Sequence, residues 1–376
     1  MKINQLSYYD RELEWQLEPI TFSDLTLLVG ISGVGKTQIL QSIIALQNIA
    51  NGKSLNGVKW QIYFTANNGI EYYWSGEFET QQISLTLLDD EENKENKFRI
   101  ISEVLLANDK KIIQRDHQEI KFHDLTLPKL SPFQSAVAIL SEEEDISPVQ
   151  DSFNSIIYSD QSISINTFHF IKYAPLTKKY SSLNLDDLQE SNLPTQIKLA
   201  LAYNHFPEVF NQIKDNFRDI FVQVEDIKLE PDQDEDLPKV IAEYPLVNIQ
   251  EKGVNRWINQ HQISSGMMRT LMHISELYLS AKGTVILIDE FENSLGVNCI
   301  DILTELILEN RNLQFIITSH HPYIINNIGM EHWKIITRKG GVVTARDAKD
   351  LNLGKSRHQA FMQLMNLEEY KEGITA

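Results

Sequence analysis

The chain has 376 residues, enough for one large domain or two of medium size. Apolar residues make up 42% and aromatic residues 9%, so the chain can bury a core and does not belong to the disordered class. The net charge of −18 argues against a broad basic surface for nucleic acid, although a local basic groove, or one built with a partner, stays possible. No apolar run approaches the ~20 residues of a membrane span, so no membrane association is expected.

Cysteine content and the N-terminus indicate the compartment. Cys299 is the single cysteine, which excludes an internal disulfide and a multi-cysteine zinc site. The opening residues, MKINQ, lack the apolar segment of a signal peptide, so a reducing cytoplasm is the expected location. Acidic residues cluster at 89–92, 142–145 and 232–236, and we interpret these clusters as solvated loops rather than an acidic site.

The first 130 residues predict a buried strand, a helix and then a set of antiparallel strands. Residues 25–29 (LTLLV) form a short apolar run before a glycine-rich segment, and residues 38–49 carry apolar side chains at helical spacing. The β-like segments that extend a sheet after this helix are residues 60–64, 70–74, 83–88 and 98–106.

Residues 131–260 predict a mostly helical insertion. Helical patches at residues 146–157, 185–201 and 208–220 precede a β-hairpin formed by residues 221–229 and 240–248. The sequence has no sustained heptads, so no long coiled-coil arm is expected.

From residue 261 onward helices and strands alternate, which is typical of a parallel α/β sheet. The expected order is helix 264–280, strand 284–288, helix 297–310 and strand 314–318, then a β-pair at 333–337 and 342–345 and a helix at 356–370. We therefore expect an α/β fold in three parts: an N-terminal lobe (residues 1–130), the insertion (131–260) and a C-terminal lobe (261–376).

Residues 30–37 read GISGVGKT and match the phosphate-binding pattern GxxxxGK[ST] at every position. The glycines let backbone N–H groups surround phosphate oxygens, Lys36 reaches the β- and γ-phosphates, and Thr37 supplies a hydroxyl to Mg²⁺. The strand before and the helix after are the context that this motif requires, which disfavours a plain glycine-rich turn. The residues expected to bind the nucleotide here are Gly30, Ser32, Gly33, Val34, Gly35, Lys36, Thr37 and Gln38.

Two carboxylates follow the apolar strand 284–288 (TVILI). At the end of a central strand, Asp289 would lie near Mg²⁺, and Glu290 would act as the general base that polarises the attacking water. An acidic helix N-cap is the alternative, and the phosphate loop in the same chain disfavours it.

Two further segments are weaker signals on their own. Ser264, Ser265 and Gly266 open a helix, where N–H groups bind anions, although ordinary capping explains the same residues. His320 follows strand 314–318 and could contact the γ-phosphate, and a metal site that includes His321 is the rival interpretation.

The order of these four segments resembles the ABC-type ATPase superfamily. The amino-acid sequences of the motifs resemble those of the bacterial ATPases related to the overcoming-lysogenisation-defect, RecF and SMC heads. Three segments carry the resemblance: residues 3–37, which end LLVGISGVGKT; residues 288–295, IDEFENSL; and residues 319–325, SHHPYII. The resemblance implies an ABC-type P-loop NTPase head with an antiparallel β-subdomain and a mixed α/β insertion.

The resemblance also implies that two heads meet head to tail and bury two ATP molecules between them. Lys36 and Thr37 of one copy would hold the phosphates and Mg²⁺. Asp289 would complete the Mg²⁺ shell, Glu290 would be the catalytic base and His320 the switch histidine. Such a head would form a homodimer or a higher oligomer through its ATP sites.

The serine-glycine segment, Ser264 to Gly266, would come from the other copy. Gln134 is the candidate for the glutamine that such heads place at Mg²⁺. The chain departs from the family pattern at three places. Residues 264–267 read Ser-Ser-Gly-Met where transporters have Ser-Gly-Gly-Gln, Phe291 replaces a common proline, and Gly296 replaces the usual histidine or aspartate. None of these departures removes a catalytic group.

A transporter subunit and an SMC-like tether are the rivals within the superfamily. The stretch between the phosphate loop and the serine-glycine helix is too long for a compact transporter head, and it lacks the heptads of a tether. We expect an ATP-hydrolysing head that acts through a separate effector protein, a nuclease or toxin, in anti-phage defence. The alternatives are a nucleotide-gated binding module with little turnover and a DNA-repair head that binds DNA directly.

Overall fold

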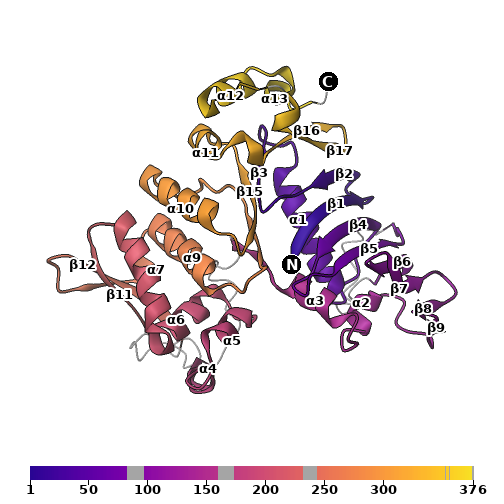
Figure 1. The fold of residues 1–376 in the computed structure, drawn as a ribbon, viewed down its shortest axis with the longest axis horizontal. Coiled ribbons are helices and arrows are strands. Elements are labelled where there is room, and N and C mark those ends of the chain that lie inside the picture. Colours follow the sequence, from indigo (N-terminus) through magenta and orange to yellow (C-terminus); the bar gives the residue numbers. More distant parts are fainter. Residues whose placement is uncertain (83–96, 160–172, 232–243, 352, 355, 375–376) are drawn as a thin grey trace, which may run out of the picture. The chain divides into compact units, whose positions relative to one another are not determined.

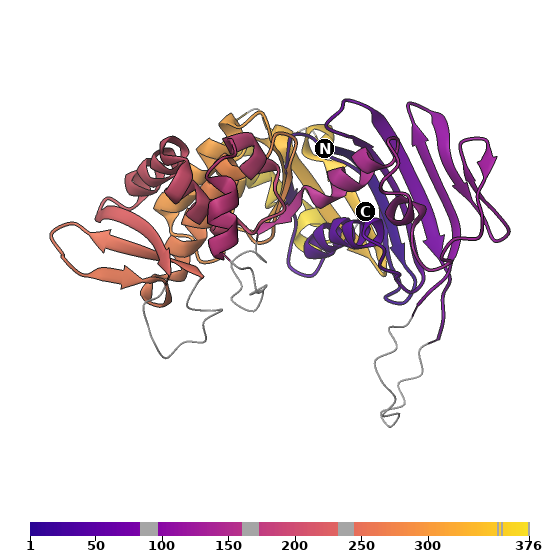
Figure 2. The same ribbon diagram turned by 90° about the horizontal axis from the view of Figure 1, so that it is seen from below.

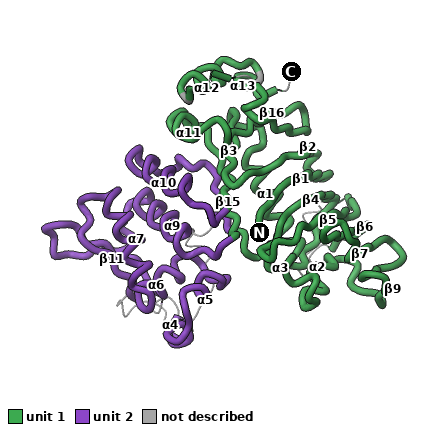
Figure 3. The backbone as a smooth tube through the Cα atoms, in the orientation of Figure 1, with its two compact units in different colours: residues 1–156, 283–287, 314–376 green, residues 157–282, 288–313 purple. Residues whose placement is uncertain are grey.

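The computed structural model describes residues 1–376 except 83–96, 160–172, 232–243, 352, 355 and 375–376. The chain forms two compact units, and both combine segments that are far apart in the sequence (Figure 3). Unit 1 comprises residues 1–156, 283–287 and 314–376, and unit 2 comprises residues 157–282 and 288–313. The expected division into residues 1–130, 131–260 and 261–376 stays a prediction. It follows the order of the sequence, whereas the two units are defined by contacts in space.

Unit 1 is built on a large mixed sheet (Figure 1). Its strands are β1 (Lys2–Asp10), β2 (Trp15–Thr21), β3 (Leu25–Val29), β4 (Val58–Thr65), β5 (Glu71–Phe78), β6 (Ile100–Ala107), β7 (Lys110–Arg115), β8 (Ile120–Phe122), β9 (Leu125–Thr126), β14 (Val285–Ile288), β15 (Gln314–Ser319), β16 (Trp333–Lys339) and β17 (Val342–Asp347). The spatial order of these strands is β14-β15-β3-β16-β17-β2-β1-β4-β5-β6-β7-β8-β9. Strand β10 (Ile156–Tyr158) begins at the last residue of the first segment of unit 1 and continues into unit 2. The expected α/β class is confirmed.

Parallel strands surround β3. This strand is buried at every position and lies between β15 and β16, parallel to both. A strand with neighbours of this kind buries both faces, which explains the near-continuous apolar sequence LTLLV. The strands expected at residues 25–29, 284–288 and 314–318 are therefore confirmed as β3, β14 and β15.

The strands from β4 to β9 pair antiparallel in sequence order and confirm the expected antiparallel β-subdomain (Figure 2). Side chains in β4 alternate between buried and exposed, as a strand covered on one face requires. Phe64 and Trp74 on the covered face contact Phe153, with ring centroids 5.4 and 5.1 Å away. The expected strand 83–88 lies outside the described residues.

The helices of unit 1 are α1 (Lys36–Ala50), α2 (Ala136–Ile139), α3 (Ser147–Asn154), α11 (Pro322–Asn327), α12 (Arg357–Leu364) and α13 (Glu368–Glu372). Helix α1 follows β3 directly, as expected, and buries Ile39, Leu40, Ile43 and Leu46 along one face. The single helix expected at residues 356–370 is two short helices, α12 and α13. In the part of the chain that the structure describes, no helix is both long and apolar enough to cross a membrane.

Unit 2 combines helices with a small antiparallel sheet. The helices are α4 (Tyr173–Tyr180), α5 (Leu185–Glu190), α6 (Thr195–His205), α7 (Pro207–Ile220), α9 (Ser265–Leu279) and α10 (Val297–Glu309), and the strands are β11 (Val224–Pro231), β12 (Pro245–Glu251) and β13 (Trp257–Asn259). Helix α9 packs against α6, α7 and α10. The helix expected at residues 185–201 is wrong as one element: it is divided into α5 and α6 before Pro194, because the residue before a proline avoids the helical conformation.

A buried lysine of α6 donates hydrogen bonds to two other helices of unit 2, α5 and α9. Lys198 of α6 is 6% exposed, and its ammonium donates to the carbonyls of Gln189 at 2.7 Å and Leu279 at 3.3 Å. Burial lowers the pKa of Lys198 from 10.5 to about 8.

The lowered pKa of Lys198 predicts a pH-dependent stability. Between about pH 8 and 10 Lys198 binds more protons in the unfolded chain than in the folded one, so its contribution to the free energy of unfolding should rise with pH across this range. The rise should be on the order of 2 kcal/mol, from about 1.4 kcal/mol per pKa unit. Burial raises the pKa of Tyr8 and Tyr244, which opposes the rise near pH 10 in every variant, so the contribution of Lys198 is measured as a difference. In urea unfolding at pH 8, 9 and 10, the free energy of unfolding of wild type minus that of Lys198→Met should increase with pH. The same difference for the exposed-lysine control Lys282→Met should not change with pH, and an unchanged difference for Lys198→Met would contradict the assignment.

Candidate nucleotide-binding site

The phosphate loop joins β3 to α1 within unit 1. Gly30 needs the absence of a side chain, because a Cβ atom there would lie 2.7 Å from the Ile336 carbonyl oxygen of β16. Gly33 has φ +86° and Gly35 has φ +103°, in the left-handed region that glycine adopts without strain. Each of these three positions in the loop therefore has a close contact or a backbone conformation that favours glycine.

The start of α1 presents donors next to this loop. Lys36 is 8% exposed, and its ammonium donates to the carbonyls of Gly30 at 2.7 Å and Ile31 at 2.9 Å. Thr37 is exposed, and the N-cap position is Gly35, which has no side chain to cap the helix. A helix start without a side-chain cap, beside a lysine and a hydroxyl, has the donor set that a Mg²⁺-bound triphosphate requires.

The C-terminal segment packs on one side of the same loop. Gly373, at the end of α13, has φ +64°, and a Cβ atom there would lie 2.7 Å from the side chains of Ile31 and Val34. Its carbonyl accepts a hydrogen bond from the Arg338 N–H at 2.7 Å. Nothing in the sequence pattern predicts the approach of Gly373 to Ile31 and Val34, because these residues are more than 300 positions apart in the chain.

The two carboxylates follow β14 and lie in unit 2. Asp289 is half-buried and Glu290 is exposed, with φ +45°. The Tyr158 hydroxyl donates to Oδ2 of Asp289 at 3.5 Å. Tyr158 was not predicted as a site residue, since its 131-residue separation from Asp289 leaves no motif that could reveal the contact.

The serine-glycine segment opens α9, also in unit 2. Oγ of Ser264 accepts the Met267 N–H at 3.3 Å, so Ser264 is the N-cap of the helix. Ser264 and Ser265 are exposed, whereas a Cβ atom on Gly266 would overlap the Ser294 carbonyl oxygen. Capping is thus confirmed, and binding of the nucleotide of another copy by these residues stays a prediction.

The two histidines after β15 differ in their surroundings. His320 is exposed at the end of the strand, in unit 1. His321 is the N-cap of α11, and its Nδ1 accepts the Tyr323 N–H at 3.3 Å. The structure therefore gives His321 a capping role and leaves His320 as the candidate for nucleotide contact.

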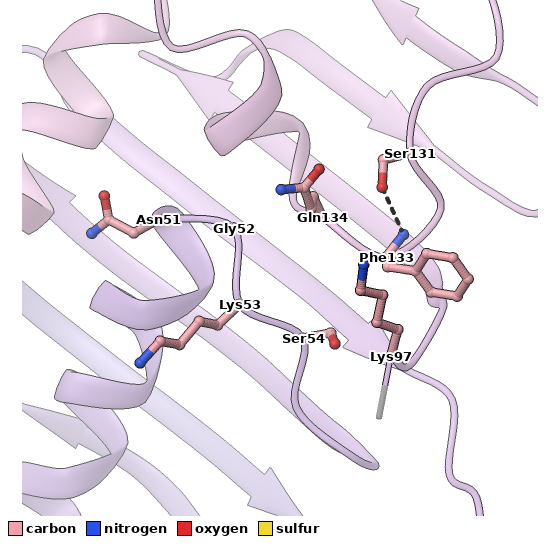
Figure 4. A pocket seen from close by; sticks show the side chains of 8 residues that line it. All are labelled: Asn51, Gly52, Lys53, Ser54, Lys97, Ser131, Phe133 and Gln134. Atoms are coloured by element: carbon pink, nitrogen blue, oxygen red, sulfur yellow. Dashed lines mark hydrogen bonds between the residues drawn. The ribbon is translucent and has the colours of Figure 1, made fainter. Parts of the chain in front are cut away.

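Gln134 lies at the wrong end of α1 to bind Mg²⁺ at Thr37. Figure 4 shows it beside Asn51 and Gly52 in a cavity of about 500 Å³, and a Cβ atom on Gly52 would lie 3.0 Å from Nε2 of Gln134. Thr37 is in the first turn of this 15-residue helix and Gly52 lies just beyond its last, so about 20 Å separates the two ends at 1.5 Å per residue. A glutamine side chain cannot span that length, and the expected role of Gln134 is wrong.

The parallel strands around β3, the phosphate loop at its carboxyl end and the helix after it define a P-loop ATPase. The chain belongs to the AAA_21 family, described as "AAA domain, putative AbiEii toxin, Type IV TA system", whose model matches residues 25–326. Among curated proteins, no sequence matches the chain.

Solved structures of SMC heads share the fold. One is the SMC head bound to the C-terminal winged-helix domain of ScpA, with 13% sequence identity, a TM-score of 0.53, and 92% of this chain and 98% of that chain covered. Another is the SMC head domain with an extended coiled coil bound to the C-terminal domain of ScpA from Pyrococcus furiosus, with 12% identity, a TM-score of 0.51, and 97% and 98% covered. The expected SMC- and ABC-like head fold is therefore confirmed.

Gly30→Ala should destabilise the phosphate loop. The new methyl group would meet the Ile336 carbonyl, a backbone atom that cannot turn aside, so the free energy of unfolding should fall by about 1–3 kcal/mol. Urea unfolding measures this change, with Ser32→Ala, an exposed change in the same loop, as the control. Equal stability of the two variants would contradict the close approach.

Proposed function

We propose that the chain binds and hydrolyses ATP with Mg²⁺. The observation that carries this proposal is the phosphate loop at the end of β3. Its left-handed glycines and the uncapped start of α1 leave backbone N–H groups for an anion, and the ammonium of Lys36 lies beside them. Membership of a P-loop family supports it.

Within this proposal each group has one role. Lys36 neutralises the β- and γ-phosphates, and Thr37 and Asp289 hold Mg²⁺, which offsets the charge that develops on the phosphates. Glu290 orients and deprotonates the attacking water, and its exposure leaves the carboxylate accessible. His320 contacts the γ-phosphate.

We further propose that a second copy completes the site. Ser264 and Ser265 are exposed at the start of α9, whose N-terminus attracts an anion, and we assign these residues and Gly266 to ATP held by a partner copy. The protein would then be a homodimer, or a higher oligomer, that closes around ATP.

The output of this dimer is proposed to be a separate effector protein, a toxin or nuclease in anti-phage defence. The description of the family names a toxin and a toxin–antitoxin system, and the two SMC heads of the same fold were solved with a second protein bound. The net charge of −18 opposes direct binding of DNA.

Glu290→Gln should lower phosphate release by about 10²- to 10⁴-fold while ATP still binds, because the amide cannot accept the proton of water. Lys36→Ala should lose ATP binding, because the phosphates lose their charged partner. Phosphate release and equilibrium ATP binding measure these effects, and Lys339→Ala, an exposed lysine of unit 1, is the control. Wild-type turnover no faster than that of Glu290→Gln would contradict ATP hydrolysis and favour a nucleotide-gated binding module.

Glu290→Gln with ATP and Mg²⁺ should be a dimer in light scattering, because slow turnover traps two shared ATP molecules. The same protein without ATP, and the double variant Lys36→Ala/Glu290→Gln with ATP, should be smaller. A monomer under trapping conditions would contradict the shared site.

A further inference from the structure

A buried arginine joins the helix that opens with Ser264 to the turn that carries the two carboxylates. Arg269 lies in the second turn of α9 and is 7% exposed. Its Nη2 donates to the Asp289 carbonyl at 3.1 Å and lies 3.5 Å from the Glu290 carbonyl. These atoms all belong to unit 2, and the contacts are made to the main chain of the turn.

The main chain of this turn is in an unfavourable conformation. Glu290 has φ +45° and Ser294 has φ +62°, in the left-handed region that residues with a Cβ atom rarely adopt. Such conformations persist where the surrounding structure holds them. The two carbonyls that Arg269 reaches lie on either side of the Glu290 Cα, so the guanidinium is placed to hold the turn.

Arg269 is itself oriented by buried polar side chains. Nε of Arg269 donates to Nε2 of His273 at 3.3 Å, and since a guanidinium can only donate, the ring hydrogen is on Nδ1. Nδ1 donates to Oγ of Ser159 at 3.0 Å, and the Ser159 hydroxyl donates to Glu276 at 2.5 Å. Ser159, His273 and Glu276 are each 3% exposed or less, so this chain of hydrogen bonds is shielded from solvent.

The start of α9 also packs on the far end of the same turn. Gly266 approaches the Ser294 carbonyl so closely that a Cβ atom would overlap it. Helix α9 therefore contacts the turn near both of its left-handed residues, through Gly266 at Ser294 and through Arg269 at Glu290.

We propose that Arg269 is a positioning residue for hydrolysis. It holds the main chain of Asp289 and Glu290 so that the Glu290 carboxylate is aimed at water, and it ties this geometry to the exposed serines at the start of α9. Engagement of Ser264 and Ser265 by a phosphate would thereby be transmitted to the base of the same chain. This inference rests on the proposed ATP hydrolysis.

The test compares Arg269→Gln and Arg269→Lys with Arg311→Gln, which makes the same chemical change at an exposed arginine of unit 2. Arg269→Gln should lower kcat by about 10- to 100-fold, the effect of a small misplacement of a reacting group, with the Kd for ATP within about threefold of wild type. Arg269→Lys retains a charged donor and should recover part of kcat. Arg311→Gln should match wild type. Unchanged kcat in Arg269→Gln, or an equal loss of kcat in both Arg269 variants together with lost ATP binding, would overturn the proposal.

Hydrogen exchange separates this inference from the proposed activity and from a general loss of folding. Arg269→Lys, which preserves the buried charge, should exchange faster in the peptide that covers residues 289–295, with α6 and α7 unchanged. If wild type has no turnover above Glu290→Gln, the proposed hydrolysis fails while this measurement still tests the contact. Exchange at residues 289–295 equal to wild type, or faster exchange spread over all of unit 2, would overturn the positioning role.

Discussion

The close approach of the phosphate loop to the sheet is the constraint on which unit 1 depends. Strand β3 is buried between two parallel neighbours, and at its end the backbone of Gly30 lies against the Ile336 carbonyl of β16. The loop can turn there because Gly33 and Gly35 adopt left-handed conformations. As a result α1 begins directly after the loop, and its first-turn N–H groups and Lys36 are presented next to β3.

Unit 2 also contains a turn with left-handed residues, but these residues are not glycines. The turn after β14 places non-glycine residues, Glu290 and Ser294, in the left-handed region. A glycine at position 290 would relieve the conformation but remove the carboxylate. The compensation is a buried guanidinium, Arg269, that is held by His273 and bonded to the main chain of the turn. Packing thus holds a main-chain conformation that a residue with a Cβ atom rarely adopts.

Patterns within one segment predicted the elements well. The apolar run of β3, the helical spacing of α1 and the alternation after residue 261 were each readable because the signal lies in consecutive residues. The prediction failed where one residue outweighed a pattern, as at Pro194, which divides the helix expected at residues 185–201. It failed again for Gln134, because no local pattern states that this residue lies beside Gly52, at the far end of α1 from Thr37.

The sequence by itself determined the phosphate loop, the carboxylates Asp289 and Glu290 and the class of fold, because each depends on residue type at short spacing. The tertiary structure alone decided that His321 caps α11, that Tyr158 donates to Asp289 and that Arg269 donates to the main chain of the turn after β14. For Tyr158 and Arg269 the contact joins elements separated along the chain, and for His321 it follows from how the backbone turns after β15. The physical reason is that side-chain neighbours are set by packing, which sequence spacing does not encode.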